Sequence, residues 1–221
     1  MKSARDRETR QRLLSAAARL FAERGFAKVS VRDICRKARA NVAAVNYHFN
    51  GKIGLYEEVL GSAIRTMQET TEMAKQAGSG RAAEEQLRAY VEVFLHRVTG
   101  RDQSSWIHQF MVREMSDPTP ALDMVIEQVI RPRMAYLCGV VAGLLDCEVE
   151  DPRVLRCAMS VHVQCLALFD NRFMDRMHGT PDRTPRGLDA MVDHIVGFSL
   201  AGIDAVRALG STKGTKITKV V

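Results

Sequence analysis

The chain has little that suggests catalysis, secretion or membrane insertion. Its 221 residues contain no Gly-x-Ser-x-Gly elbow, no phosphate-binding loop and no His-Glu-x-x-His motif, so three common enzyme classes lack their signatures. The polar start, MKSARDRETRQR, has no apolar core of a signal peptide. The longest apolar run, residues 137–145, is about half a membrane span. We therefore expect a cytoplasmic protein that makes no membrane contact and is not an enzyme.

Cysteines and aromatic residues are also few. The five cysteines are an odd number and fall within helical patterns, which indicates free, buried thiols in a reducing compartment. His162 and Cys165 have the i, i+3 spacing of metal ligands, but no clear third ligand accompanies them. The sequence therefore predicts neither a metal site nor a cofactor.

Positive charge is concentrated at the N-terminal end. The formal net charge is +6, yet residues 1–65 hold 14 basic and 6 acidic side chains, and residues 66–221 hold 18 and 20. A generally basic surface for solubility would show no such division. A basic N-terminal region attracts phosphate and releases counterions on binding DNA. This distribution favours double-stranded DNA as a partner.

Residues 30–49 have the pattern of a helix-turn-helix. Ser30 and Asp33 are spaced as a capping box at the start of a first short helix. Asn41 is a good N-cap for a second short helix. Upstream, an amphipathic helix is expected over residues 8–24, ended by Gly25, and it completes a three-helix head.

The second short helix has two different sides. Val42, Val45 and Phe49 form an anchoring side. The opposite side is small, polar and aromatic and carries no acid, and alanine and asparagine can both contact base edges. Lys52 follows at the start of the next helix, where a phosphate is favoured. The predicted DNA-contacting residues are Ser30, Arg32, Asn41, Val42, Ala43, Ala44, Asn46, Tyr47, His48 and Lys52.

Residues 8–56 resemble the DNA-binding domain of the tetracycline-repressor (TetR/AcrR) family of bacterial regulators. The resemblance rests on Phe21-x-x-x-Gly25-Phe26, Ser30-Val31-Arg32-Asp33-Ile34, Ala38 and Tyr47-His48-Phe49-x-x-Lys52. Two positions depart from the family pattern. Arg39 stands where glycine is usual, which costs roughly 1 kcal/mol if the site is left-handed. Asn46 stands where an aromatic residue is usual, which we interpret as a change of specificity.

The remaining chain shows helical patterns and no convincing strand. Helices are expected over residues 52–76, 82–99, 103–115, 118–146, 152–177 and 186–209. The last three each begin at an N-cap followed by proline, at Asp117-Pro118, Asp151-Pro152 and Thr184-Pro185. Pro132 is expected to kink the first of them. The prediction is an all-α protein of about nine helices.

Three segments follow from this division. They are a DNA-binding head at 1–52, a helical ligand-binding and dimerisation body at 53–210, and a disordered basic tail at 211–221. The family resemblance implies the role of the body. A stretch from Arg113-Glu114-Met115 to Ile130-Arg131-Pro132 further resembles a subgroup linked to antibiotic sensitivity and efflux control.

We expect a homodimer, because a two-fold dimer reads two half-sites of DNA. Apolar residues on the last two helices are the predicted interface. A mostly apolar cavity with a few polar contacts is expected in the body, although each of its residues is also ordinary core material. The predicted ligand-binding residues are Trp106, Phe110, Met111, Arg113, Met134, His162, Cys165 and Phe169.

These observations lead to one functional hypothesis and one alternative. The hypothesis is a transcriptional repressor that leaves a palindromic operator when a small, largely apolar effector binds. The alternative is a helical protein-interaction module with a vestigial DNA-binding head. The sequence does not distinguish repression from activation.

Overall fold

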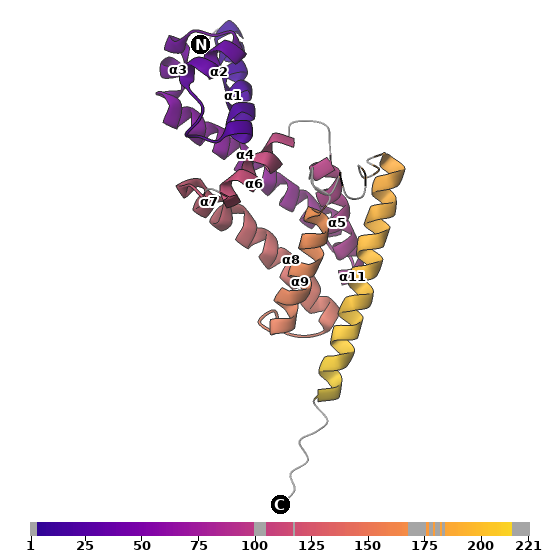
Figure 1. Cartoon of the computed structure of the whole chain (residues 1–221). Coiled ribbons are helices and arrows are strands. Elements are labelled where there is room, and N and C mark those ends of the chain that lie inside the picture. Colours follow the sequence, from indigo (N-terminus) through magenta and orange to yellow (C-terminus); the bar gives the residue numbers. More distant parts are fainter. Residues whose placement is uncertain are drawn as a thin grey trace, which may run out of the picture. The chain divides into compact units, whose positions relative to one another are not determined.

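The structure is a computed structural model that describes residues 4–99, 105–116, 118–167, 176, 179, 182 and 184–213. The predicted all-α class is confirmed, because these residues form helices and include no strand (Figure 1). The first half contains α1 (Ala4–Arg24), α2 (Val31–Ala38), α3 (Val42–Phe49), α4 (Lys52–Gly78) and α5 (Ala83–Thr99). The second half contains α6 (Ser105–Ser116), α7 (Pro120–Val125), the π-helix η1 (Ile126–Ile130), α8 (Arg131–Leu145), α9 (Pro152–Leu166) and α11 (Pro185–Lys213).

Two of the three predicted proline starts are confirmed. Asp151 caps α9 by accepting a hydrogen bond from the backbone N–H of Arg153 at 2.8 Å. The Oγ1 of Thr184 accepts from the backbone N–H of Gly187 at the start of α11. The third start is wrong by two residues, because Thr119 is the N-cap of α7 and Pro120 follows it. Asp117-Pro118 and Thr119-Pro120 are both suitable starts for a helix. The hydroxyl of Thr119 also donates a hydrogen bond to Glu114, and this bond favours Thr119 as the cap.

Pro132 perturbs its helix as predicted. The turn before it is the π-helix η1, and proline has no N–H to donate to the carbonyl of Gln128 four residues earlier. The side chain of Gln68 donates to that carbonyl at 3.1 Å. A side chain of α4 therefore satisfies the acceptor that Pro132 leaves open.

The chain divides into two compact units. The N-terminal unit comprises Met1–Gln68 and Arg101–Gln128, and the C-terminal unit comprises Glu69–Gly100 and Val129–Val221. In the N-terminal unit α1 packs against α2, α3 and α6 around buried residues such as Leu13, Phe21 and Ile34. In the C-terminal unit α5, α8, α9 and α11 pack around Leu87, Leu137 and other buried residues.

Two expected boundaries change at the C-terminal end. Residues 211–213 were expected in the disordered tail, but they belong to α11, which continues to Lys213. Residues 211–213 extend α11, which packs against α5, α8 and α9 of the C-terminal unit. Residues 214–221 lie outside the described part of the chain. The helix α9 is described to Leu166, and residues 168–175, where it was expected to continue, are also outside.

Candidate nucleic-acid interface

The predicted capping box at the start of α2 is present. The backbone N–H of Asp33 donates to the Oγ of Ser30 at 3.1 Å, and the backbone N–H of Ser30 donates to Asp33 Oδ2 at 3.2 Å. The hydrogen bond from the Ser30 side chain lowers the pKa of the Asp33 carboxyl. These reciprocal bonds satisfy two backbone donors and fix where the helix-turn-helix begins.

The turn between α2 and α3 contains a strained non-glycine residue. Arg39 has φ 51° and ψ 50°, which is the left-handed region that the sequence identified as costly. Asn41 then caps α3, because its Oδ1 accepts from the backbone N–H of Ala43 at 2.9 Å. The predicted cap at Asn41 is confirmed, and the conformation of Arg39, which the sequence left open, is left-handed.

The exposed side of α3 is polar and aromatic. Ala43, Asn46 and Tyr47 are exposed, with 70% of Tyr47 accessible, while Ala44 is half-buried. Val45 and Phe49 are buried and anchor the helix. A helix anchored along one side and free of acids on the other has the form needed to enter a major groove.

Two residues of α3 do not lie as expected. Val42 was expected on the anchoring side but is 43% exposed, because the buried contacts begin one turn later at Val45. His48 was expected to face outward, but only 2% of its side chain is exposed and its Nε2 lies 3.4 Å from Oδ1 of Asp6. The sequence did not identify this contact, because α1 and α3 are brought together only by folding.

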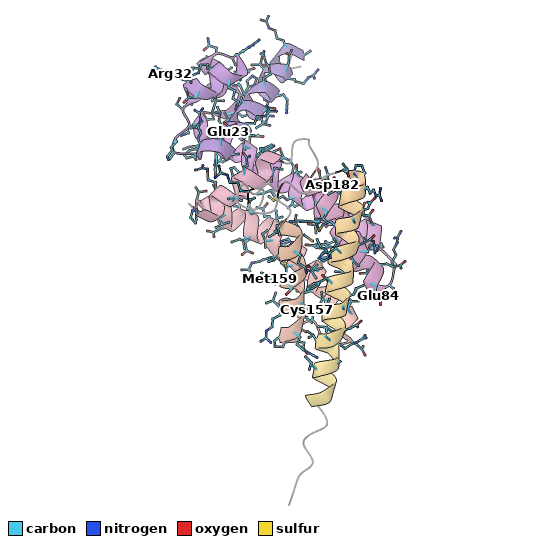
Figure 2. The ribbon with its side chains drawn as sticks, turned by 45° about the vertical axis from the view of Figure 1, so that its right-hand side comes forward. Glu23, Arg32, Glu84, Cys157, Met159 and Asp182 are labelled. Atoms are coloured by element: carbon cyan, nitrogen blue, oxygen red, sulfur yellow. The ribbon has the colours of Figure 1, made fainter. Side chains whose placement is uncertain are left out.

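The other predicted DNA-contacting residues flank α3. Ser30, Arg32 and Asn41 are exposed, and Figure 2 shows Arg32 at the surface. The ammonium of Lys52 lies 4.1 Å from the ring centroid of Phe26, and burial lowers its pKa. Lys52 is therefore partly enclosed at the first residue of α4.

A buried acid connects the second turn of α4 with α6. Glu114 is 4% exposed, and its carboxylate accepts a hydrogen bond from the hydroxyl of Tyr56 at 2.7 Å. The same carboxylate accepts from the hydroxyl of Thr119 at 2.7 Å and from the backbone N–H of Thr119 at 3.2 Å. The Tyr56 ring contacts the rings of Phe21, Phe26 and Phe110. The sequence did not identify this cluster, and its only signal was an acid within an apolar stretch.

Arg113 binds the C-terminal end of α1. Its Nε donates to the carbonyl of Ala22 at 3.4 Å, and its NH2 group donates to the carbonyl of Glu23 at 3.0 Å. Gly25 has φ 79°, and a Cβ atom there would lie 3.1 Å from Arg113 Cδ. Glycine thus permits both the left-handed turn and the close approach of the arginine.

The predicted ligand-binding residues fall in both units. In the N-terminal unit α6 carries Trp106, Phe110, Met111 and Arg113, and the Phe110 side chain is buried. In the C-terminal unit α8 carries Met134, and α9 carries the buried residues His162 and Cys165. Phe169 lies outside the described residues.

His162 sits in a polar cluster of the C-terminal unit. Its Nδ1 lies 2.8 Å from the Tyr90 hydroxyl, and its ring contacts Phe94 edge-on. Burial lowers the pKa of His162 to about 4, and the nearby Arg133 adds to this effect. Arg133 is 5% exposed and donates to the Thr71 hydroxyl at 3.1 Å.

The described part of the chain has neither a candidate metal site nor a candidate membrane span. Within it, no group of three or more histidine, cysteine or acidic side chains could hold a metal ion. None of its helices combines the length and the apolar character that a membrane crossing requires.

The comparisons with known proteins agree with this architecture. Residues 13–59 match the model of the bacterial regulatory proteins of the tetR family, and residues 83–203 match that of the C-terminal domain of the HTH-type transcriptional dual regulator CecR. The CecR protein of Shigella flexneri is 28% identical over 156 residues, which are 67% of this chain and 70% of that protein. The probable regulator YttP of Bacillus subtilis is 35% identical over 79 residues, which are 36% of this chain and 38% of that protein.

Solved structures show the same fold. A TetR-family regulator from Streptomyces coelicolor aligns with a TM-score of 0.63 at 21% identity, over 89% of this chain and 96% of that one. One from Mesorhizobium loti aligns with a TM-score of 0.62 at 17% identity, over 90% and 98%. The relatives are transcriptional regulators and not enzymes. With its capped helix-turn-helix, its all-helical fold and a family model that matches more than half of its length, the chain belongs to the TetR family of DNA-binding transcriptional regulators.

Proposed function

We propose that this protein is a cytoplasmic, ligand-responsive repressor that leaves a palindromic operator when a small, largely apolar effector binds. The proposal treats residues 1–52 as the DNA-binding head and residues 53–210 as the ligand-binding and dimerisation body. The observation that carries it is the exposed, acid-free side of α3, with Ala43, Asn46 and Tyr47 presented by a capped turn.

The proposal includes a homodimer formed through α9 and α11. Four apolar side chains on one side of α9 are exposed, namely Leu155, Met159, Val163 and Leu166. Met159 is labelled on α9 in Figure 2. On α11, Phe198 is 65% exposed, and among the described residues no side chain or other helix lies within 4 Å of a Cβ placed on Gly197 or Gly202. A second copy would cover this apolar surface and position two heads on one operator.

Val163→Glu tests the interface against a matched substitution. We expect it to convert a dimer into a monomer in analytical ultracentrifugation, because a buried carboxylate has no partner there. Val149→Glu is the control, since Val149 is also about half exposed but lies off α9. A dimer that survives Val163→Glu at micromolar concentration would place the interface elsewhere.

For the effector, we propose a site in the C-terminal unit that includes Met134, His162 and Cys165. The polar cluster of His162, Tyr90 and Arg133 would supply the few polar contacts that such a site needs. The structural neighbours include the ketosteroid transcriptional regulator KstR2 of Mycobacterium tuberculosis and a Saccharomonospora viridis regulator in complex with choline. Apolar molecules such as ketosteroids fit the proposed effector and are the first candidates to screen, whereas choline is a cation and fits it less well. The α6 residues Trp106, Phe110, Met111 and Arg113 remain predictions from the sequence.

For the response, we propose that a movement of α6 reaches the head through Arg113 and Glu114. Arg113 binds the end of α1 and Glu114 binds Tyr56 of α4, all within the N-terminal unit. Shifting a 99:1 population of the DNA-competent form to 1:99 needs about 5.5 kcal/mol of differential effector binding.

Selection of bound duplexes from a random DNA library, followed by a salt titration of the winner, is the decisive experiment. A palindromic winner with a steep salt slope supports the proposal and provides a probe for effector screening. Absence of any enriched duplex, even at low salt, would contradict it and favour an interaction module.

A further inference from the structure

A hollow lies beside the exposed side of α3, entirely within the N-terminal unit. Its volume is about 510 Å³, and its walls are Arg5, Asp6 and Thr9 of α1 with Ala43, Ala44, Tyr47 and His48 of α3. The first turns of α1 thus extend the surface that α3 presents. This arrangement is not visible in the sequence, because more than 30 residues separate the two segments.

Asp6 of α1 and His48 of α3 lie in contact at this hollow. The Nε2 of His48 lies 3.4 Å from Oδ1 of Asp6, and the two side chains are 2% and 22% exposed. Within the first turns of α1, the Thr9 hydroxyl donates to the backbone carbonyl of Arg5 at 2.9 Å. Arg5 is the neighbour of Asp6 in the sequence, and both side chains line the hollow that α3 borders.

The chemistry of the hollow suits the backbone of DNA. Arg5 is exposed and brings a guanidinium, the group that binds phosphate best. Ala43 and Ala44 give small apolar walls that leave room for a deoxyribose ring. If α3 enters the major groove, the surface beside it meets the strand that borders this groove.

We propose that this hollow receives one sugar–phosphate unit of the bordering strand, with Arg5 binding its phosphate and His48 acting as a positioning residue. The inference rests on the proposed DNA-binding function and names a contact from outside the helix-turn-helix. A phosphate contact fixes the register of α3 on the duplex without reading a base.

The test compares Arg5→Ala with Arg7→Ala in the full chain. Both arginines are exposed on the first turns of α1 and carry the same charge, but only Arg5 lines the hollow. The probe is a duplex selected by the unaltered protein. We expect Arg5→Ala to reduce the slope of log K against log salt by about 0.9 for each protomer bound, with a clearly smaller reduction for Arg7→Ala. Arg5→Lys should retain the slope.

Phosphate-ethylation interference gives the second readout. We expect one interfering phosphate at the border of each half-site to be lost in Arg5→Ala and retained in Arg7→Ala. His48→Ala should lose the same phosphate although it keeps Arg5, with thermal unfolding measured to verify the fold. Equal slopes for the two arginine variants, or interference unchanged in Arg5→Ala, would overturn the inference. Failure of the unaltered protein to select any duplex would instead overturn the proposed function.

Discussion

Each unit buries a polar cluster around a tyrosine hydroxyl, but the two clusters carry opposite charge. In the N-terminal unit, Tyr56 donates to the carboxylate of Glu114, which also accepts two bonds from Thr119. In the C-terminal unit, Tyr90 bonds to His162 near the buried guanidinium of Arg133. The acid is surrounded by fixed donors, which lock three helical segments together. The basic cluster is instead sensitive to protonation, since burial lowers the pKa of both His162 and Arg133.

Removing the acid should give the largest effect. Glu114→Ala is expected to lower the free energy of unfolding of the N-terminal unit by about 3 kcal/mol, because buried donors lose their acceptor and a cavity remains. Urea unfolding combined with hydrogen exchange of each unit measures it. Glu57→Ala, at an exposed position of α4, is the control and should change stability little. Equal effects of the two substitutions would show that the Glu114 cluster does not lock its unit.

Acid should destabilise the C-terminal unit through His162. Its folded pKa of about 4 lies below the ordinary value of 6.5, so the neutral form is favoured on folding. This stabilisation is complete above pH 6.5 and is lost as the pH falls towards 4. The loss is a few kcal/mol, since each pKa unit corresponds to about 1.4 kcal/mol.

The difference between unaltered protein and His162→Phe isolates this contribution. The free energy of unfolding of the variant should depend less on pH between 6.5 and 4. His194→Phe, at an exposed position of α11, should keep the full dependence. If the free energy of unfolding depends on pH equally in His162→Phe and His194→Phe, the cluster of the C-terminal unit is not the one that responds to protonation.

A smaller effect concerns a surface turn of the N-terminal unit. Arg39→Gly should raise its free energy of unfolding by about 1 kcal/mol, because glycine adopts the left-handed conformation without a Cβ clash. Lys37→Gly, at a helical position of α2, should instead lower stability by about 1 kcal/mol. Thermal unfolding of the two variants measures the difference, and a shift of the same sign in both would contradict strain at Arg39.

The smallest expected effect is at the carbonyl that Pro132 leaves open. Gln68→Ala should lower the free energy of unfolding by about 0.5 kcal/mol, because Gln128 loses a hydrogen bond that is exposed to water. Gln76→Ala, at an exposed position of the same helix, is the control. Equal urea midpoints for the two variants would show that water replaces the Gln68 side chain fully.

Local chemistry explains what the sequence predicted well. The capping pair of Ser30 and Asp33, the cap at Asn41 and the irregular turn before Pro132 depend on neighbouring residues, whose spacing is visible in the chain. Helical periodicity likewise indicated that Val45 and Phe49 anchor α3. At the start of α7 the sequence predicted Asp117-Pro118 wrongly, because the cap is Thr119, whose hydroxyl also bonds to Glu114 five residues earlier.

The sequence by itself determined an all-helical chain with a capped helix-turn-helix and a basic N-terminal region. Only the tertiary structure decided that His48 turns to Asp6, that Arg113 binds the end of α1 and that Glu114 accepts from Tyr56. These contacts join residues 42 to 91 positions apart. No periodicity or cap encodes such a pairing, because it depends on how separate helices pack and on which buried polar group finds a partner.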